Sequence, residues 1–175
     1  ALKQLTDSGV AVFFMHGNRD FLVGKAFCAA TGAQILPDPS IITAQGKTIV
    51  LAHGDLLCTD DTAHQRFRWL GAQRWARALW FASPRWWRER IAQKLRNNSR
   101  SRDYTPEFTN RIMDVNDSAV IKLLEQYQAQ QLIHGHTHRP NTHLVPVNYG
   151  VAQRLVLPDW RVKNGVVVQG ALHTV

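Results

Sequence analysis

Three short apolar runs along the chain are each followed by a cluster of glycine, histidine, amide or acidic residues. The runs cover residues 10–15, 48–52 and 131–133, and the clusters that follow are Gly17-Asn18-Arg19-Asp20, His53-Gly54-Asp55 and Gly135-His136-Thr137-His138. Short apolar runs bounded by glycine are typical of buried β-strands. In layered α/β proteins, the loops beyond the carboxyl ends of such strands build the site. The pattern therefore predicts an α/β fold in which three strand ends form a site.

Helices and further strands are predicted around these runs. Apolar residues at helical spacing predict helices over residues 21–31 and 117–128. Asn116 fits an N-cap and Gly32 a C-cap, while Asp20 is either an N-cap or a catalytic carboxylate. Additional strands are expected at residues 35–36, 41–43, 144–145, 155–157 and 166–168, the last three as strands of a sheet edge.

Residues 62–98 depart from this α/β pattern. Arginine and tryptophan are interleaved there at helical spacing, Ser83-Pro84 separates two helices, and five of the six tryptophans lie within the stretch. A basic, aromatic helical pair fits a surface that meets anionic lipid head groups. The alternative is an ordinary helical insertion whose aromatic residues form a core and whose charges are solvated. A polar, basic loop is expected to follow at residues 97–103.

Composition narrows the class of protein. With 175 residues and 45% hydrophobic residues, the chain is one domain-sized unit able to bury a core, and no apolar run approaches the length of a membrane span. Two cysteines do not make a disulfide framework, which favours a reducing cytoplasm. The formal net charge of +8 suits either nucleic acid or an anionic membrane. No nucleic-acid-binding motif is recognised, so no nucleic-acid partner is expected.

The histidine cluster after residue 133 indicates metal binding. In an extended or tightly turned backbone, residues two apart project to the same side, so His136 and His138 can present two imidazoles to one point. Gly135 lets the backbone approach a ligand closely. A polar turn that is rich in histidine by chance is the alternative. Four other histidines are given no ligand role. His16 and His134 are expected to pack or to orient their neighbours, and His143 and His173 are expected to lie at the surface.

The three clusters together resemble the later signature blocks of the calcineurin-like metallophosphoesterases. Longer strings narrow the resemblance to the UDP-2,3-diacylglucosamine diphosphatase family of lipid A synthesis, and they lie at residues 17–22, 53–61, 112–116 and 133–140. This resemblance implies an α/β sandwich of two β-sheets flanked by helices, with residues 1–175 in a single metallophosphoesterase domain. It also implies that residues of about 62–105 form a helical, lipid-binding cap inserted into that domain.

The resemblance implies hydrolysis of the pyrophosphate bond of UDP-2,3-diacylglucosamine, which yields UMP and 2,3-diacylglucosamine 1-phosphate. It also implies that a hydroxide activated by two divalent metal ions would attack the phosphorus in line; Mn²⁺ is expected, with Zn²⁺ or Fe as alternatives. The location implied is cytoplasmic, peripheral on the inner membrane of a Gram-negative bacterium, with the anionic membrane surface as a partner. The alternatives are a metallophosphoesterase for a soluble nucleotide or phosphodiester, and a catalytically silent binding module.

The family's site residues are carried over position by position. Asn18, His53 and His136 would bind one metal, and His138 would bind the other. Arg19 stands where most calcineurin-like enzymes have histidine, and because a guanidinium keeps its proton, Arg19 would clamp phosphate charge. Catalytic roles are thus expected for Asn18, Arg19 and His136, and substrate contacts for the same three residues together with Asp61 and Ser99.

Two parts of the family pattern have no match. The opening Asp-x-His and Gly-Asp blocks of the family have no counterpart before Val10. The chain is therefore expected to be an N-terminally truncated fragment that lacks the bridging carboxylate and is inactive by itself. A lysine that contacts substrate in the family has no counterpart near residues 100–110, where Arg100 or Arg102 could substitute.

Overall fold

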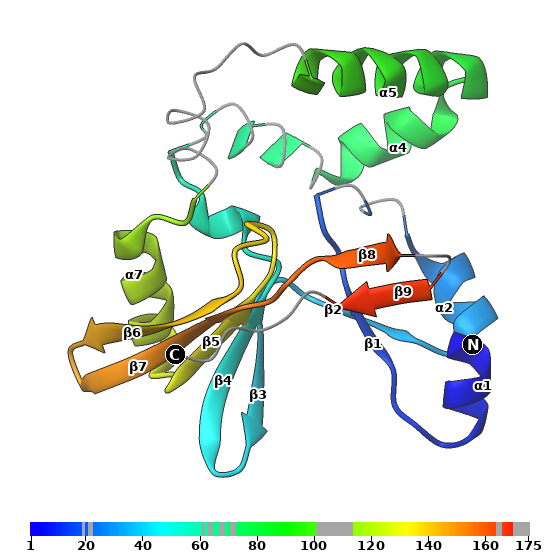
Figure 1. Ribbon diagram of the computed structural model, residues 1–175. Coiled ribbons are helices and arrows are strands. Elements are labelled where there is room, and N and C mark those ends of the chain that lie inside the picture. The colour runs from blue at the N-terminus through cyan, green and yellow to red at the C-terminus, as the bar shows by residue number, and fades with distance from the viewer. Residues whose placement is uncertain are drawn as a thin grey trace. The chain divides into compact units, whose positions relative to one another are not determined.

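The chain divides into two compact units in its computed structural model (Figure 1). The sheet unit comprises Ala1–Thr59 together with Asp114–Val175, and the helical unit comprises Asp60–Met113. The predicted insertion at about 62–105 falls within the helical unit, and its role as a lipid-binding cap stays a prediction. The structure describes residues 1–18, 20, 23–60, 62, 65–66, 69–70, 73–100, 114–163 and 166–169.

A five-stranded mixed sheet is the largest element of the sheet unit (Figure 1). Its strands, in spatial order, are β3 (Ser40–Ala44), β4 (Lys47–Ala52), β5 (Gln131–His134), β7 (Gly150–Val156) and β6 (Asn141–Val147). The three central strands are parallel, and β3 and β6 pair antiparallel with their neighbours. Because the central strands point the same way, their carboxyl ends meet at one edge of the sheet, where the motif residues follow.

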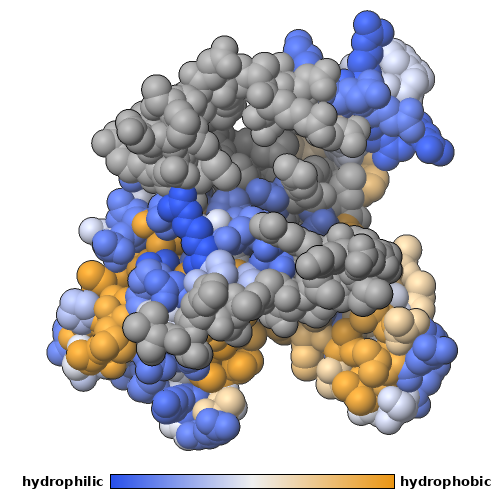
Figure 2. All heavy atoms as spheres, in the orientation of Figure 1, coloured by the Kyte–Doolittle hydropathy of each residue, from blue (hydrophilic) through white to orange (hydrophobic). Residues whose placement is uncertain are grey.

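Shorter elements complete the sheet unit. β1 (Phe13–Met15) pairs in parallel with β2 (Gln34–Leu36). The helices of the same stretch are α1 (Leu2–Asp7) and α2 (Lys25–Thr31), and Figure 2 shows apolar surface over them. An antiparallel pair follows later in the chain, formed by β8 (Trp160–Lys163) and β9 (Val166–Gln169). Helices thus flank a mixed sheet, and the α/β class that the sequence predicts is confirmed.

The core of the sheet unit lies between the sheet and α7 (Asp117–Tyr127), which contacts β4 and β6. Val120 and Leu124 of α7 are buried in one cluster with Val50 of β4 and Leu132 of β5. Residues four apart on a helix lie on the same face, so Val120 and Leu124 meet the sheet together. This packing fixes β4 and β5 beneath α7 and so supports the strand ends that carry the site.

Two predicted helix caps are confirmed. The Oδ1 atom of Asn116 accepts hydrogen bonds from the backbone N–H groups of Ser118 and Ala119, so Asn116 is the N-cap of α7. Gly32 ends α2 with φ of 72°, and its N–H donates to the carbonyl of Cys28. Glycine adopts this left-handed conformation without the steric cost that a Cβ atom brings.

The predicted start of α2 is wrong. α2 begins at Lys25 after Gly24 as N-cap, so Asp20 does not cap it. The Oδ2 atom of Asp20 instead accepts a hydrogen bond from the N–H of Gly17 at 3.3 Å. That bond turns the carboxylate back toward the loop, away from the N–H groups that a cap must reach.

Two further local predictions are wrong. One fails because of long-range strand pairing, and the other because a helix extends farther than expected. β7 contains most of the run 155–157 and lies inside the sheet, bonded to β5 on one side and β6 on the other, instead of at an edge. α5 (Arg85–Arg100) covers the first residues of the predicted loop at 97–103, because extending a nucleated helix costs little even through polar residues. Residues 101–103 lie outside the described part of the chain.

In the helical unit, the predicted break at Ser83-Pro84 separates α4 (Arg74–Ala82) from α5, as expected. The hydroxyl of Ser83 donates to the carbonyl of Trp80 at 2.6 Å. The rings of Trp80 and Trp87 pack across the break with their centroids 6.2 Å apart. Within the described residues, every helix is too short or too polar to cross a membrane.

Candidate active site

β4 and β5 bring two motif histidines together. Ala52 lies opposite His134 in the parallel pair, and beyond it the N–H of Gly135 donates to the carbonyl of His53 at 3.0 Å. The pairing therefore continues past the end of both strands. The rings of His53 and His136 meet there nearly edge to face, with centroids 5.1 Å apart. Strand pairing thus places two histidines from distant parts of the sequence in one site.

The backbone on either side of His53 is held in place. The N–H of His53 donates to Oδ1 of Asp38 at 3.1 Å. Gly54 follows with φ of 114°, and a Cβ atom built on it would lie 2.9 Å from Nδ1 of His134 and 3.0 Å from the carbonyl oxygen of Gly135. Glycine is required at this position because both the backbone conformation and the close approach exclude a side chain.

The end of β1 approaches the same histidine. A Cβ atom added to Gly17 would lie 3.1 Å from Cε1 of His53 and 3.0 Å from Oδ2 of Asp20. Gly17 therefore lets the two loops come close, and the exposed Asn18 follows it directly in the chain. Arg19, the next predicted site residue, lies outside the described part of the chain.

His136 and His138 both adopt left-handed backbone conformations, with φ of 65° and 53°. Their backbone is turned, one of the two forms that the sequence suggests, and it is not extended. Such φ values cost energy in non-glycine residues and are found preferentially at functional sites. His136 is half-buried against His53, whereas His138 is exposed.

His134 is buried and keeps a neutral ring. Its pKa is lowered from 6.5 to about 4, mainly by burial and to a smaller extent by the nearby charge of Arg154. Because arginine has only donors, Nε2 of His134 accepts from Nη1 of Arg154 at 3.4 Å, and Nδ1–H donates to the carbonyl of Gly135 at 2.9 Å. His134 therefore packs and orients the loop, as the sequence predicts. His16 also has an anchoring bond, from its Nε2 to the carbonyl of Val23 at 2.7 Å.

The donor set fits a cation in one respect. Nε2 of His53 is buried and has no hydrogen-bond partner. A buried polar nitrogen without a partner is costly, and coordination to a cation would remove that cost. Within the described residues, however, no group of three or more His, Cys, Asp or Glu side chains is arranged to hold a metal ion. His53 thus has a nitrogen suited to bind a cation, and the ligand roles of His53 and His136 stay predictions.

Comparisons with known proteins relate most of the chain to one kind of enzyme. A protein from Enterobacter sp. (strain 638) named UDP-2,3-diacylglucosamine hydrolase is 43% identical over 167 residues, which are 95% of this chain and 69% of the relative. A protein of the same name from Escherichia coli O81 (strain ED1a) is 42% identical over the same shares of both chains. The chain belongs to the UDP-2,3-diacylglucosamine hydrolase family. No family model matches the chain.

The structure describes some, but not all, of the site residues that the family resemblance predicts. His53 and His136 follow the paired strands β4 and β5, Asn18 follows β1 of the two-stranded sheet, and His138 lies on the loop of His136. Asp61 lies outside the described residues. Ser99 is in the last turn of α5, in the helical unit, and its side chain is not described. The roles of all these residues remain predictions.

Sequence reasoning missed a second polar cluster beside this loop in the UDP-2,3-diacylglucosamine hydrolase fold. Arg154 is buried on β7 between Ala152 and Val156, which point to the same face of the sheet. His143, expected at the surface, is half-buried opposite Arg154 on β6. The signal in the sequence was an arginine at a position that strand alternation assigns to the core face.

Proposed function

We propose that the protein hydrolyses the pyrophosphate bond of UDP-2,3-diacylglucosamine and releases UMP and 2,3-diacylglucosamine 1-phosphate, a step of lipid A biosynthesis. The observation that carries this proposal is the 43% identity to a UDP-2,3-diacylglucosamine hydrolase across 95% of the chain. The contact between the rings of His53 and His136 agrees with it, because that contact joins two of the motifs in one site.

In this proposal, the residues at the strand ends have separate roles. Asn18, His53 and His136 would hold one divalent cation and His138 a second, with Mn²⁺ as the proposed metal because imidazole and amide ligands suit it. When bound, such cations supply an activated water and neutralise the charge of the phosphate oxygens. Arg19 would add two donors in a planar fork to the phosphate, and it cannot serve as the proton donor to the leaving group.

The lipid part of the substrate is assigned to the helical unit. Exposed apolar side chains in its described part include Trp75 (58% exposed), Leu79 (65%) and Trp86 (64%). Acyl chains gain free energy by covering such surface, at about 0.8 kcal/mol for each buried CH₂ group. Asp61 and Ser99 are proposed to contact the sugar and phosphate. A peripheral position on the cytoplasmic face of the inner membrane follows from a substrate that is anchored there.

The first experiment measures UMP release from UDP-2,3-diacylglucosamine by the product of the full natural gene. We expect turnover that depends on Mn²⁺ and falls at least about a hundredfold in Asn18→Ala and in His53→Ala, because each loses an electrostatic stabiliser of the reaction. Metal content, measured by mass spectrometry, should fall in both variants while their circular dichroism stays native.

Gln153→Ala provides the matched control, since Gln153 is exposed on β7 of the same sheet. It should retain full activity and full metal content. Full turnover by either site variant with unchanged metal content would reject the ligand assignment. Absence of UMP release by the unmodified protein, with hydrolysis of simple phosphodiesters retained, would instead reject the substrate.

A further inference from the structure

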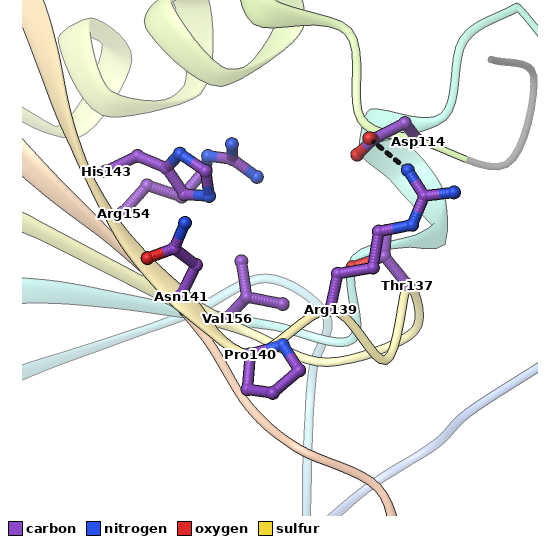
Figure 3. Close-up of a pocket in the computed structure, with 8 residues that line it drawn as sticks. All are labelled: Asp114, Thr137, Arg139, Pro140, Asn141, His143, Arg154 and Val156. Atoms are coloured by element: carbon purple, nitrogen blue, oxygen red, sulfur yellow. Dashed lines mark hydrogen bonds and ion pairs between the residues drawn. The ribbon is translucent and has the colours of Figure 1, made fainter. Parts of the chain in front are cut away.

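A cavity of about 440 Å³ opens in the sheet unit next to the histidine loop (Figure 3). One wall comes from β6 and β7, another from the loop after His136, and a third from Asp114, which precedes α7. Its volume is within the range of small-molecule sites in proteins. The lining residues are Asp114, Thr137, Arg139, Pro140, Asn141, His143, Arg154 and Val156.

Arg154 is the unusual member of this lining. It is only 8% exposed, and its described contact is the hydrogen bond from Nη1 to Nε2 of His134. Within the described residues, no carboxylate lies within ion-pair distance of its guanidinium. A buried charge is costly unless an opposite charge pairs with it. Among the described residues, Arg154 therefore has no ion-pair partner, and Asp114 and Asp117 act on its charge only from a longer distance.

The nearest acidic residue of the cavity is already engaged. Oδ2 of Asp114 accepts from Nη1 of Arg139 at 2.7 Å, and Figure 3 shows this pair across the cavity from Arg154 and His143. Because Asp114 is paired with Arg139, it acts on the charge of Arg154 only from beyond ion-pair distance, as Asp117 also does. His143 lies directly opposite Arg154 in the β6–β7 pairing and adds a ring nitrogen to the same side.

We propose that this cavity binds an oxyanion of the phosphate class, with Arg154 as its charged donor and His143 and Asn141 beside it. A guanidinium matches two phosphate oxygens with two parallel hydrogen bonds, which suits Arg154 better than a single-point contact. Two sources have this chemistry: free inorganic phosphate, and the phosphate of a nucleoside monophosphate such as UMP. The second source rests on the proposed function.

The test titrates the purified natural gene product with UMP, inorganic phosphate and uridine by calorimetry. Each titration is run with the divalent cations present and again with EDTA, which keeps phosphate from binding through metals. The deciding variant is His143→Glu, matched by His143→Gln. A glutamate opposite Arg154 supplies the missing carboxylate and forms a favourable cross-strand pair, so the fold should be retained.

We expect UMP or phosphate to bind in EDTA, His143→Gln to change the affinity less than about threefold, and His143→Glu to weaken it about tenfold or more. The thermal unfolding temperature of His143→Glu should equal or exceed that of the unmodified protein. If His143→Glu does not fold, Arg154→Lys replaces it: lysine keeps the charge, loses the two-pronged contact, and should also weaken binding about tenfold.

The outcomes separate the two sources and the two proposals. Binding of UMP at least about tenfold tighter than phosphate assigns the cavity to the nucleotide end of the substrate, and equal binding assigns it to free phosphate. Uridine that binds as tightly as UMP, no binding of either anion, or binding that His143→Glu leaves unchanged would overturn the oxyanion site. Loss of hydrolase activity does not bear on these metal-free titrations, so failure of the proposed function would be seen separately.

Discussion

The sheet unit and the helical unit treat their apolar residues in opposite ways. In the sheet unit, Val50, Leu124 and Leu132 have no exposed surface. In the described part of the helical unit, no residue is fully buried, and Trp75 and Trp86 are 58% and 64% exposed. The sheet unit thus covers its own core, whereas the helical unit leaves large aromatic side chains in water.

This difference in burial predicts that the two units contribute differently to folding stability and to substrate binding. Removing apolar surface from water lowers the free energy of the folded state, so the buried residues of the sheet unit stabilise its fold. Exposed aromatic residues of the helical unit contribute little to folding, and their proposed role in binding the acyl chains stays a prediction. Substitutions in the two units should therefore affect different measurements.

The largest expected effect compares two leucines. Leu132→Ala removes a fully buried side chain between β4 and β7 and should lower the free energy of unfolding by about 2–5 kcal/mol. Leu79→Ala, at a position that is 65% exposed on α4, should change it by no more than about 0.5 kcal/mol. Urea unfolding followed by circular dichroism measures both. Equal losses would show that the helical unit also depends on a buried core.

A smaller effect is expected on substrate affinity. Replacing both Trp75 and Trp86 with serine should raise KM for the diacylated substrate about tenfold, which corresponds to losing roughly two buried CH₂ groups. Hydrolysis of a small chromogenic phosphodiester should not change, because it has no acyl chain. Steady-state kinetics with both substrates tests this expectation.

Two controls accompany that pair of substitutions. Leu144→Ser, at a position 71% exposed on β6, should alter neither substrate. Trp80→Ser, which removes the ring packed against Trp87, should reduce thermal stability of the helical unit and affect both substrates. If Trp75 and Trp86 also affected both substrates equally, their role would be structural.

The smallest expected effect on stability concerns the hydrogen bonds of one tyrosine hydroxyl within the sheet unit. The hydroxyl of Tyr149 lies 2.7 Å from the carbonyl oxygen of Ala129 and 3.0 Å from that of Leu124, so it fastens the β6–β7 turn to the end of α7. Tyr149→Phe should lower the free energy of unfolding by about 0.5–1.5 kcal/mol at pH 7.

The pH dependence of Tyr149 gives a second measurement. Burial, and then the charge of Glu125, raise the pKa of Tyr149 above 10.0. A raised pKa in the folded state means that this contribution is complete below the unfolded-state pKa and is lost as pH rises through the folded-state pKa. Unfolding curves at several alkaline pH values should show that loss in the unmodified protein and lack it in Tyr149→Phe. The same slope in both proteins would assign the pH dependence to other groups.

Features that depend on neighbouring residues could be predicted from the sequence. The N-cap at Asn116, the left-handed Gly32 and the break at Ser83-Pro84 follow from the chemistry of one or two residues each. The strands ending before His53 and His134 follow from short apolar runs bounded by glycine. These signals act over one turn of helix or one strand, so no partner element is needed to recognise them. The family motifs are likewise local strings.

Features that depend on distant partners became apparent in the folded chain. The contact between His53 and His136 requires β4 to pair with β5, and the interior place of β7 requires β5 on one side and β6 on the other. α2 begins later than predicted, at Lys25, and Asp20 bonds to its own loop and does not cap the helix. Strand alternation assigns Arg154 to the core face, but only the folded sheet shows that it contacts His134 and has no described carboxylate within ion-pair distance. Burial and charge pairing are properties of surroundings assembled from separate parts of the sequence, and local patterns carry no record of them.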